Sequence, residues 1–473
     1  MSILDKFLEI DSDETLYQYT FSYKNTLMYP FIRYFLLQNA KENILKMPSA
    51  YDPIHFGTIH KYKYYIKSFW HRPPKHLQSD IVFFGSDTSN IRQGNMYFNR
   101  LTEFFANEYP SKTILIELSN KMDYKRPRTY PKVFSKDYVD IRATIKSKWK
   151  SVNSKDLLQI DSFLHYLKQQ FNHEFSDSTV WNEIKNTLVY NVKILPRLFE
   201  EYTKLLKRIS PKVIFLEDAC YGGSNIPLMM AAKELNIPIG EYQHGFISLD
   251  HPAYNYSNRI PSSYKYYMPD FYMSYGKYWE NNSRIPIKKI EVGNPNISNA
   301  VSQYVNEIKK EHILYISSVV YPERDVQEVI RLNKIMAEQG YLVMFRIHPS
   351  EIPRLQTVYK PVVDAGILID TQPLYDTLKR TKYIIENISI ENSSVENIST
   401  VLFEATMFDC IIFVIKTPLH KEDIGVPQFN CVQSVYEIAE VINSKNYIKT
   451  EPNHFWADDW RSKFRKLIDS YLL

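Results

Sequence analysis

The segment that decides the fold class is HILYISSVVYPERDVQEVIRLNKIMAEQGYLVMFRIHP, residues 312–349. Its beginning, 312–318, is a short apolar run that is typical of a buried strand. Apolar residues then recur at helical spacing over 324–339, and a second apolar run covers 341–349. A strand, a helix and a strand in this order predict a right-handed crossover between two parallel strands.

The same alternation continues on both sides of this segment. Toward the C-terminus it predicts strands at 366–370, 382–386 and 411–415 and helices at 373–380 and 400–408. Toward the N-terminus it predicts strands at 80–85, 112–118, 211–218 and 237–242, helices at 96–108 and 224–236, and two helices within 155–209. Residues 288–295 close this half of the chain. We therefore expect an α/β fold with two Rossmann-like, doubly wound lobes facing a cleft and a helical N-terminal extension.

Four regions follow from this pattern. Residues 1–75 form a helical extension that is rich in aromatic and basic residues, and residues 76–292 form the N-terminal lobe, expected on the acceptor side. Residues 293–455 form the C-terminal lobe, expected to bind the donor, and residues 456–473 form a last amphipathic helix.

Composition excludes several classes of protein. A net charge of +5 over 473 residues is too small to favour nucleic acid as a partner. The three cysteines lie far apart, which argues against a disulfide framework or a zinc site and favours a reducing compartment. The N-terminus lacks the layout of a signal peptide, and no apolar run approaches the ~20 residues of a membrane span, so we expect a cytoplasmic protein. The sequence contains neither the glycine fingerprint of dinucleotide binding nor a P-loop.

Two strand ends of the second lobe carry groups suited to a phosphate. Arg346 lies two residues before His348 on one strand face, and Pro349 ends the strand. Both side chains are expected at the carboxyl end, where parallel sheets bind ligands. A guanidinium and an imidazole can bind phosphate there, but a surface histidine in a turn would give the same sequence. Ser317 and Ser318 end another predicted strand and add loop hydroxyls.

A Ser/Thr pair precedes one predicted helix of this lobe. Ser399 and Thr400 are good N-cap residues, and a helix start with free N–H groups binds anions. Glu404 lies one turn along the same face, about 6 Å away. Phosphates at the helix start and a carboxylate one turn later match a nucleotide from phosphate to ribose. Plain helix capping is the alternative, and it is compatible with binding.

In the first lobe, Glu217 and Asp218 end a predicted strand. Paired carboxylates at this position could supply a general base, or one could cap the next helix while the other is solvated. Asp87 follows another strand in the same way and is assigned to substrate binding. The acids Asp11 and Asp13 follow no strand, and we expect both to be solvated.

His244 stands at the end of the strand in GEYQHGFIS and is a third candidate for the base. Gly245 follows directly and would let a substrate approach the backbone. The alternative is that His244 is a buried histidine of the core with no role in a site. His251 and Tyr254, in the same loop, offer a polar and aromatic lining that sugars favour. The two histidines lack the helical spacing of a zinc pair, so we expect no metal.

Four short motifs carry a resemblance to a known family. They are EYQHG at 241–245, VGNP at 292–295, RIHP at 346–349 and STVLFEA at 399–405. In this order they resemble GT-B-fold glycosyltransferases of bacterial surface-polysaccharide pathways. The combination is similar to sialyltransferases and capsule Kdo transferases, which use CMP-sugars, and to teichoic-acid polymerases, which use CDP-glycerol. The GNP triplet also resembles non-hydrolysing UDP-sugar 2-epimerases, which share the fold.

The resemblance implies roles for individual residues. His348 would contact the nucleotide phosphate, Ser399 and Thr400 would bind the same phosphates, and Glu404 would face the ribose or base. One departure bears on the donor: the sialyltransferases usually carry a glycine after two acids, and here Ala219 follows. The loop 387–400 is also longer than such loops usually are.

The function expected is a metal-independent glycosyltransferase of capsule polysaccharide biosynthesis. It would transfer a sugar from a nucleotide, with CMP-sugars favoured, to a glycan or lipid-linked acceptor, and it would need no cofactor besides that donor. A sugar-nucleotide 2-epimerase of the same fold and a non-catalytic scaffold in polysaccharide assembly are the alternatives. The basic and aromatic stretch KYKYYIKSFWHR, 61–72, predicts peripheral contact with the inner membrane face, unless its aromatics pack on the first lobe.

Overall fold

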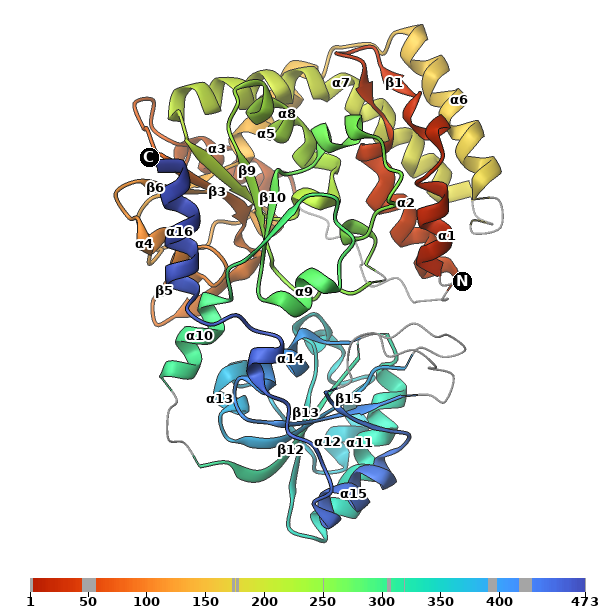
Figure 1. Ribbon diagram of the computed structural model, residues 1–473, viewed down its shortest axis with the longest axis vertical. Coiled ribbons are helices and arrows are strands. Elements are labelled where there is room, and N and C mark those ends of the chain that lie inside the picture. The colour runs from red at the N-terminus through yellow and green to blue at the C-terminus, as the bar shows by residue number, and fades with distance from the viewer. Residues whose placement is uncertain are drawn as a thin grey trace. The chain divides into compact units, whose positions relative to one another are not determined.

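The computed structural model describes residues 3–44, 57–171, 175, 178–249, 251–303, 308–318, 320–389, 398–416 and 428–472. The chain forms two compact units (Figure 1). One runs to Pro295 and takes up the chain again at Ala457, and the other runs from Asn296 to Trp456. Among the helices of the described ranges, none combines the length and apolar character that crossing a bilayer requires.

The first unit is built on a parallel sheet. Its strands, in pairing order, are β11 (Lys288–Glu291), β10 (Phe271–Ser274), β9 (Ile239–Tyr242), β8 (Val213–Leu216), β3 (Ile81–Ser86), β6 (Thr113–Leu118) and β7 (Val133–Ser135). All neighbours pair in parallel. The chain runs outward from β3 through β6 to β7, and then from β8, on the other side of β3, out to β11. This is the doubly wound arrangement that the sequence predicts.

Helices cover both faces of this sheet. On one face Phe83 and Phe215 pack with Phe105 of α4 (Glu103–Glu108) and Phe464 of α16 (Trp460–Leu472). The alternate strand residues, such as Val82, are equally buried, as a period of two requires. Three further helices, α5 (Asp137–Ser147), α7 (Ser178–Ile209) and α8 (Ile226–Glu234), form a layer in which α7 packs against the other two (Figure 1).

The remaining elements of this unit lie mainly in its N-terminal part. They are α1 (Ile3–Ile10), the hairpin β1 (Thr20–Phe21) and β2 (Thr26–Leu27), α2 (Tyr29–Ile44), α3 (Thr58–Trp70), α6 (Ser154–Gln170) and α9 (Lys277–Asn281). Helix α10 (Pro295–Ser302) begins at the boundary and belongs to the second unit. One helix prediction is wrong in part. Within 96–108, Met96–Asn99 forms β5, which pairs with β4 (Asn90–Gln93) across a turn where Gly94 has φ 58°. A hairpin closed by this glycine outweighs the helical pattern.

The second unit is a smaller doubly wound sheet. Its strands, in pairing order, are β14 (Leu368–Ile369), β13 (Leu342–Arg346), β12 (Lys310–Ile316), β15 (Thr381–Asn387), β16 (Ile411–Ile415) and β17 (Asn430–Val432). All are parallel. The core on one face includes residues of α11 (Pro322–Ala337), α12 (Lys360–Asp364) and α15 (Val435–Ser444). Two shorter helices, α13 (Leu374–Leu378) and α14 (Thr400–Thr406), contact β15.

Candidate active site

The strand order of the first unit marks one place on its sheet where a ligand is expected. The strands that follow β3 extend the sheet to one side, and the strands that follow β8 extend it to the other, while β3 and β8 themselves are neighbours. Open parallel sheets bind ligands beyond the carboxyl ends of the strands at such a switch point. Glu217 and Asp218 follow β8, and Ser86 ends β3 with Asp87 directly after it. Sequence candidates for the base and for substrate binding therefore occupy this switch point.

Glu217 bridges the two strands of the switch point. Its Oε2 accepts the Ser86 N–H at 2.7 Å, and the Tyr242 hydroxyl lies 3.4 Å from the same oxygen. Burial raises the pKa of Glu217 to about 8, and the neighbouring Asp218 carboxylate adds to the shift. The group is therefore mostly protonated at neutral pH, which suits a proton donor or a neutral positioning group better than a general base.

Asp218 and His244 form the one acid–imidazole pair of this site. Asp218 has φ 59°, a left-handed conformation that is uncommon outside glycine. Its Oδ1 lies 3.1 Å from His244 Nδ1. That oxygen is buried and accepts no well-aligned hydrogen bond from any described residue, so the imidazole lies beside it without a formed hydrogen bond. The turn after Asp218 needs Gly222 (φ 69°), because a Cβ there would lie 2.4 Å from the Pro30 carbonyl oxygen.

Glu241 is a site residue that the sequence analysis missed. It lies on β9, fully buried, and its Oε2 accepts the Cys220 N–H at 2.7 Å. The Tyr254 hydroxyl donates to Glu241 Oε1 at 2.8 Å and lies 3.4 Å from His244 Nδ1. Burial raises the pKa of Glu241 to about 7. An ionisable residue inside the apolar strand IPIGEY is the signal that would have found it.

Aromatic residues enclose the imidazole of His244. Tyr221 and Tyr254 lie with ring centroids 5.9 and 6.4 Å from it, and the Tyr221 hydroxyl is 3.2 Å from His251 Nε2. Tyr254 is fully buried, so its hydroxyl acts within the cluster. A Cβ at Gly245 would meet no atom within 4 Å, so this position opens onto free space. The structure thus brings His244, His251 and Tyr254 together with the β8 acids.

A buried ion pair holds the loop that carries His251 and Tyr254. Arg33 and Asp11 are 2% and 0% exposed and bond through both carboxylate oxygens. The same guanidinium donates to the carbonyls of Pro252 (2.6 Å) and Asn255 (2.7 Å). The prediction that Asp11 is solvated is therefore wrong, because the fold packs it against Arg33 on α2, 22 residues later. Asp13 is only partly buried and accepts the Thr15 N–H.

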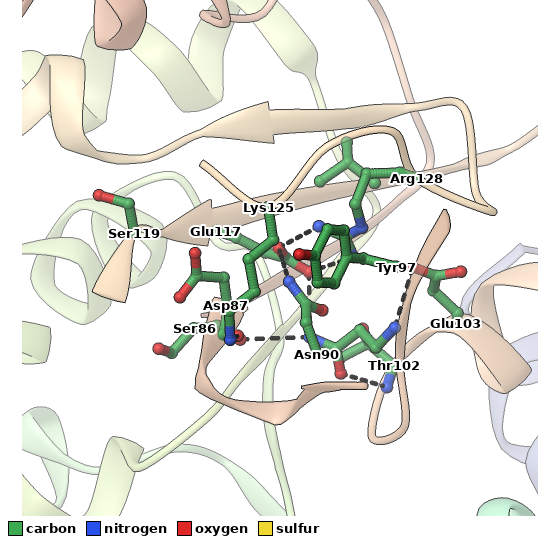
Figure 2. Close-up of polar contacts among 12 residues, drawn as sticks. Ser86, Asp87, Asn90, Tyr97, Thr102, Glu103, Glu117, Ser119, Lys125 and Arg128 are labelled. Carbon is green, nitrogen blue, oxygen red and sulfur yellow. Dashed lines mark hydrogen bonds and ion pairs between the residues drawn. The ribbon is translucent and has the colours of Figure 1, made fainter. Parts of the chain in front are cut away.

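Asp87 directly follows β3 and lies near Ser86 and Lys125 (Figure 2). Its Oδ1 accepts the Asn120 N–H at 2.6 Å, while Oδ2 is buried and accepts no hydrogen bond from the described residues. Burial raises the pKa of Asp87 to about 6. Lys125 Nζ donates to its main-chain carbonyl at 2.7 Å. A cavity of about 10 Å³, room for one water, lies beside Asp87 and is lined also by Glu117 and Lys125.

A network of charged groups stabilises this part of the sheet. Arg128 joins the carboxylates of Glu117 and Glu103 at 2.5 and 2.7 Å, and all three side chains are buried (Figure 2). Asn90 and Asn99 donate to Glu117 from the β4–β5 hairpin. Both acids are satisfied within the network, so we interpret it as support for the loop that carries Asp87.

The second unit has its own switch point, between β12 and β15. Arg324 bridges it, donating to the carbonyls of Asn387 (2.9 Å) and Ser389 (2.6 Å). Asp325 pairs with this guanidinium and accepts the Ser318 N–H at 2.5 Å. Ser317 Oγ lies 3.5 Å from the Tyr359 hydroxyl, and both serines are buried. The predicted loop donors are thus fixed in place at the β12 end.

The other second-unit candidates fall into separate local environments. Arg346 pairs with Asp370, which neutralises its charge, and it also donates to the Gln372 carbonyl at 3.0 Å. His348 is exposed just beyond the end of β13. These two residues therefore share a strand end, but Arg346 already has an anionic partner.

The Ser/Thr pair caps α14 as the sequence predicts. Ser399 Oγ accepts the Val401 N–H at 3.2 Å, and the Ser399 N–H donates to Glu386, a buried carboxyl at the end of β15. Thr400 begins the helix, and Glu404 is 6% exposed on it. Of the loop 387–400, whose length the sequence analysis noted, residues 390–397 lie outside the described ranges.

The first-unit cluster can accept and donate protons. An imidazole held against a carboxylate can take a proton from a hydroxyl, and the carboxylate stabilises the imidazolium that results. Two neighbouring carboxyls change protonation near neutral pH. These are the groups that a transfer to a hydroxyl requires.

Comparisons with known proteins identify no family. No protein-family model and no curated protein sequence matches the chain. Among solved structures, it is similar to the UDP-GlcNAc 2-epimerases of Methanocaldococcus jannaschii and Neisseria meningitidis. Both are 12% identical over 83% of this chain and 98% and 99% of theirs, with TM-scores of 0.41 and 0.42. A trehalose 6-phosphate synthase from Burkholderia multivorans is 10% identical over 84% of this chain and 96% of that one, with a TM-score of 0.41. Similarity at this level assigns no activity to the chain.

Proposed function

We propose that the chain is a metal-independent glycosyltransferase. It moves a sugar from an activated nucleotide, with CMP-sugars favoured, to a hydroxyl of a bacterial surface polysaccharide or a lipid-linked acceptor. The observation that carries the proposal is the His244–Asp218 pair at the switch point of the first unit, among carboxyls of raised pKa. The motifs EYQHG and STVLFEA, which resemble those of GT-B transferases, support it.

In this proposal His244 is the general base. Its Nδ1 faces Asp218, which leaves Nε2 for the acceptor hydroxyl. The acceptor oxygen forms a bond to the anomeric carbon of the sugar while Nε2 takes the hydroxyl proton. The bond from that carbon to the nucleotide phosphate breaks, and its electron pair leaves with the phosphate. Asp218 stabilises the imidazolium. The Tyr254 hydroxyl lies between His244 Nδ1 and Glu241 Oε1 and helps to orient the imidazole.

The nucleotide is assigned to the second unit. His348, exposed beyond β13, is the candidate partner of the phosphate, and the α14 cap with Glu404 is the candidate ribose side. Arg346 and the two serines shape the strand ends beside it. The acceptor is assigned to Asp87 and to the His251 loop of the first unit. No cofactor besides the donor is part of this scheme.

A sugar-nucleotide 2-epimerase is the second candidate. The GNP triplet at 293–295 favours it, as do Glu217 and Glu241, which can give and take protons near neutral pH. An epimerase converts its nucleotide-sugar without an acceptor. Incubating the protein with each nucleotide-sugar alone, and then with an added glycan acceptor, separates the two activities.

The central experiment removes the imidazole. His244→Ala and His244→Asn are assayed for sugar transfer and, separately, for stabilisation by CMP, CDP, UDP and GDP. A nucleotide present at 100 times its Kd stabilises the protein by about 2.7 kcal/mol, which a melting curve detects. We expect transfer to be lost and stabilisation kept. His165→Ala, an exposed histidine on α6, is the matched control. Full transfer by either His244 variant would refute the assignment.

A further inference from the structure

An apolar stripe on α3 faces outward from the first unit. Ile59, Tyr62, Ile66 and Trp70 are 73%, 65%, 68% and 83% exposed. They are three or four residues apart, so they lie along one face of the helix. Large apolar side chains this exposed, and in a row, mark a surface that meets another apolar phase.

The opposite face of α3 is fixed to the unit. Ser68 is buried, and its hydroxyl contacts the Tyr124 hydroxyl at 2.7 Å. The Tyr64 hydroxyl donates to Asp137 Oδ1 at 2.6 Å. The alternative that the aromatics of this stretch pack on the first lobe holds for Tyr64, but not for the exposed stripe. The helix is therefore anchored with its apolar row presented outward.

The net charge of the chain is concentrated at the same place. Residues 58–76 contain five bases, Lys61, Lys63, Lys67, Arg72 and Lys75, and no acid. Since the chain has 58 bases and 53 acids in total, the remaining 53 bases balance the acids. Of the five, Lys67 lies 3.4 Å from Asp123; no carboxylate among the described residues pairs with the other four. The stripe is thus bordered by positive charge that the first unit leaves mostly uncompensated.

The stripe continues into an open hollow beyond the helix. This hollow has a volume of about 720 Å³ and is lined by Tyr65, Ile66, Phe69, Trp70, Arg72 and Lys75. Tyrosine and tryptophan are the residues that favour the boundary between headgroups and acyl chains. Bases beside them attract anionic headgroups.

We propose that α3 and residues 71–76 lie on the surface of a bilayer that contains anionic phospholipid. Trp70 and Ile66 enter the headgroup boundary, and the bases bind the phosphate groups around them. A second copy of the chain is a poorer occupant, because its own α3 face carries the same positive charge. The proposal does not depend on glycosyl transfer: it concerns a helix apart from the switch-point residues.

Sedimentation with lipid vesicles tests the proposal. The parent protein is expected to sediment at low salt with phosphatidylcholine vesicles containing phosphatidylglycerol, to stay in solution with pure phosphatidylcholine, and to be released by high salt. Ile66→Ser/Trp70→Ser should lower the partition coefficient at least about tenfold. Lys61→Gln/Lys63→Gln should lower it about fivefold per base. Two matched controls in the second unit, Tyr436→Ser for the apolar change and Arg331→Gln/Lys334→Gln for the charge, should bind like the parent.

The changed side chains are exposed, so all variants should melt like the parent, which a melting curve checks. As a second measurement that keeps the apolar character, Trp70→Phe should remove most of the fluorescence quenching that brominated lipids cause. The proposal is overturned if the parent fails to sediment at low salt, or if the α3 variants sediment as it does. It is also overturned, in favour of an interface between copies, if the parent is a dimer that Ile66→Ser/Trp70→Ser dissociates.

Discussion

The two units share a sheet design but bridge its switch point with different groups. In the first unit a carboxyl group, Glu217, spans from the end of β8 to the main chain of β3. In the second a guanidinium, Arg324, spans from α11 to the main chain at the end of β15. Glu217 and Glu241 have only uncharged donors among the described residues, whereas Asp325 and Asp370 are each paired with an arginine.

This difference concerns what opposes the effect of burial on a carboxyl group. Without a cation nearby, burial raises the pKa of Glu217 and Glu241 toward neutrality, so both can exchange protons at physiological pH. Burial also raises the pKa of Asp325 to about 7, but the Arg324 charge opposes that shift, and Asp325 accepts the Ser318 N–H. What distinguishes the first unit is therefore the imidazole of His244 beside its carboxyl groups.

The largest effect is expected where the first unit would move a proton. Asp218→Asn leaves the side chain the same size but removes the charge that faces His244. We expect the transfer rate to fall by about 10² to 10⁴, with nucleotide stabilisation unchanged. Steady-state transfer assays across pH 5–9 check this. A fall in nucleotide affinity equal to the fall in rate would show that Asp218 acts on the nucleotide donor. The proposed difference in role between the two units would then be wrong.

The next effect tests the arginine bridge of the second unit. Arg324→Met leaves Asp325 buried without its partner and two carbonyls without their donor. The free energy of unfolding should fall by about 3–5 kcal/mol. Arg331→Met, at an exposed position on the same helix, is the control and should change it by less than about 0.5 kcal/mol. Equal urea denaturation curves for both variants would contradict the role given to Arg324.

A smaller effect is expected for nucleotide binding. His348→Ala removes a donor at an exposed strand end, so the fold should be kept. The Kd of the best nucleotide should rise about 10- to 100-fold, the range for one hydrogen bond to a charged group. Isothermal titration calorimetry measures it, with exposed His165→Ala as the control. Unchanged affinity for every nucleotide would show that the nucleotide does not bind at the end of β13.

The smallest effect concerns the pH dependence of stability. The pKa of Glu217 is about 8 in the folded chain and near 4.5 in an unfolded one, so the fold favours its protonated form. That contribution is complete below about pH 4.5 and is lost as pH rises through 8. As pH rises from 6 to 8, the free energy of unfolding of Glu217→Gln should therefore fall by about 1–2 kcal/mol less than that of the parent. Melting curves at each pH check this; identical slopes would mean that Glu217 is ionised in the fold.

Much of the sheet was predictable because parallel strands are buried on both faces. Apolar runs such as VIFL and IIFVI need no partner to be recognised, and they form β8 and β16. The same local signal placed Asp218 and His348 at strand ends. Short edge strands were not predicted: β7 and β17 have three residues each, too few to show a period.

Site residues that depend on distant partners were beyond local reasoning. Asp11 follows no predicted strand, so nothing near it in the sequence indicates that it is buried. It is buried because the fold pairs it with Arg33. Glu241 was taken as part of a strand, because its Tyr254 and Cys220 partners come from loops that the fold brings to β9. Helix capping depends on neighbouring residues, so Ser399 was correctly predicted as an N-cap. The ion pair of Arg346 with Asp370 joins the ends of two different strands, so the local sequence could not show it.

Helix α16 belongs to the core of the first unit. Phe464 and Ile468 cover one face of that sheet, yet they follow the whole of the second unit in sequence. During synthesis on the ribosome, this face therefore stays uncovered while residues 296–456 are made. A chain truncated after residue 456 should be cut by protease in the first unit and protected in the second, because only the first unit lacks part of its core. The region translated later would thus become resistant to protease without the earlier one, and the acid-rich switch point would become rigid only when α16 is present.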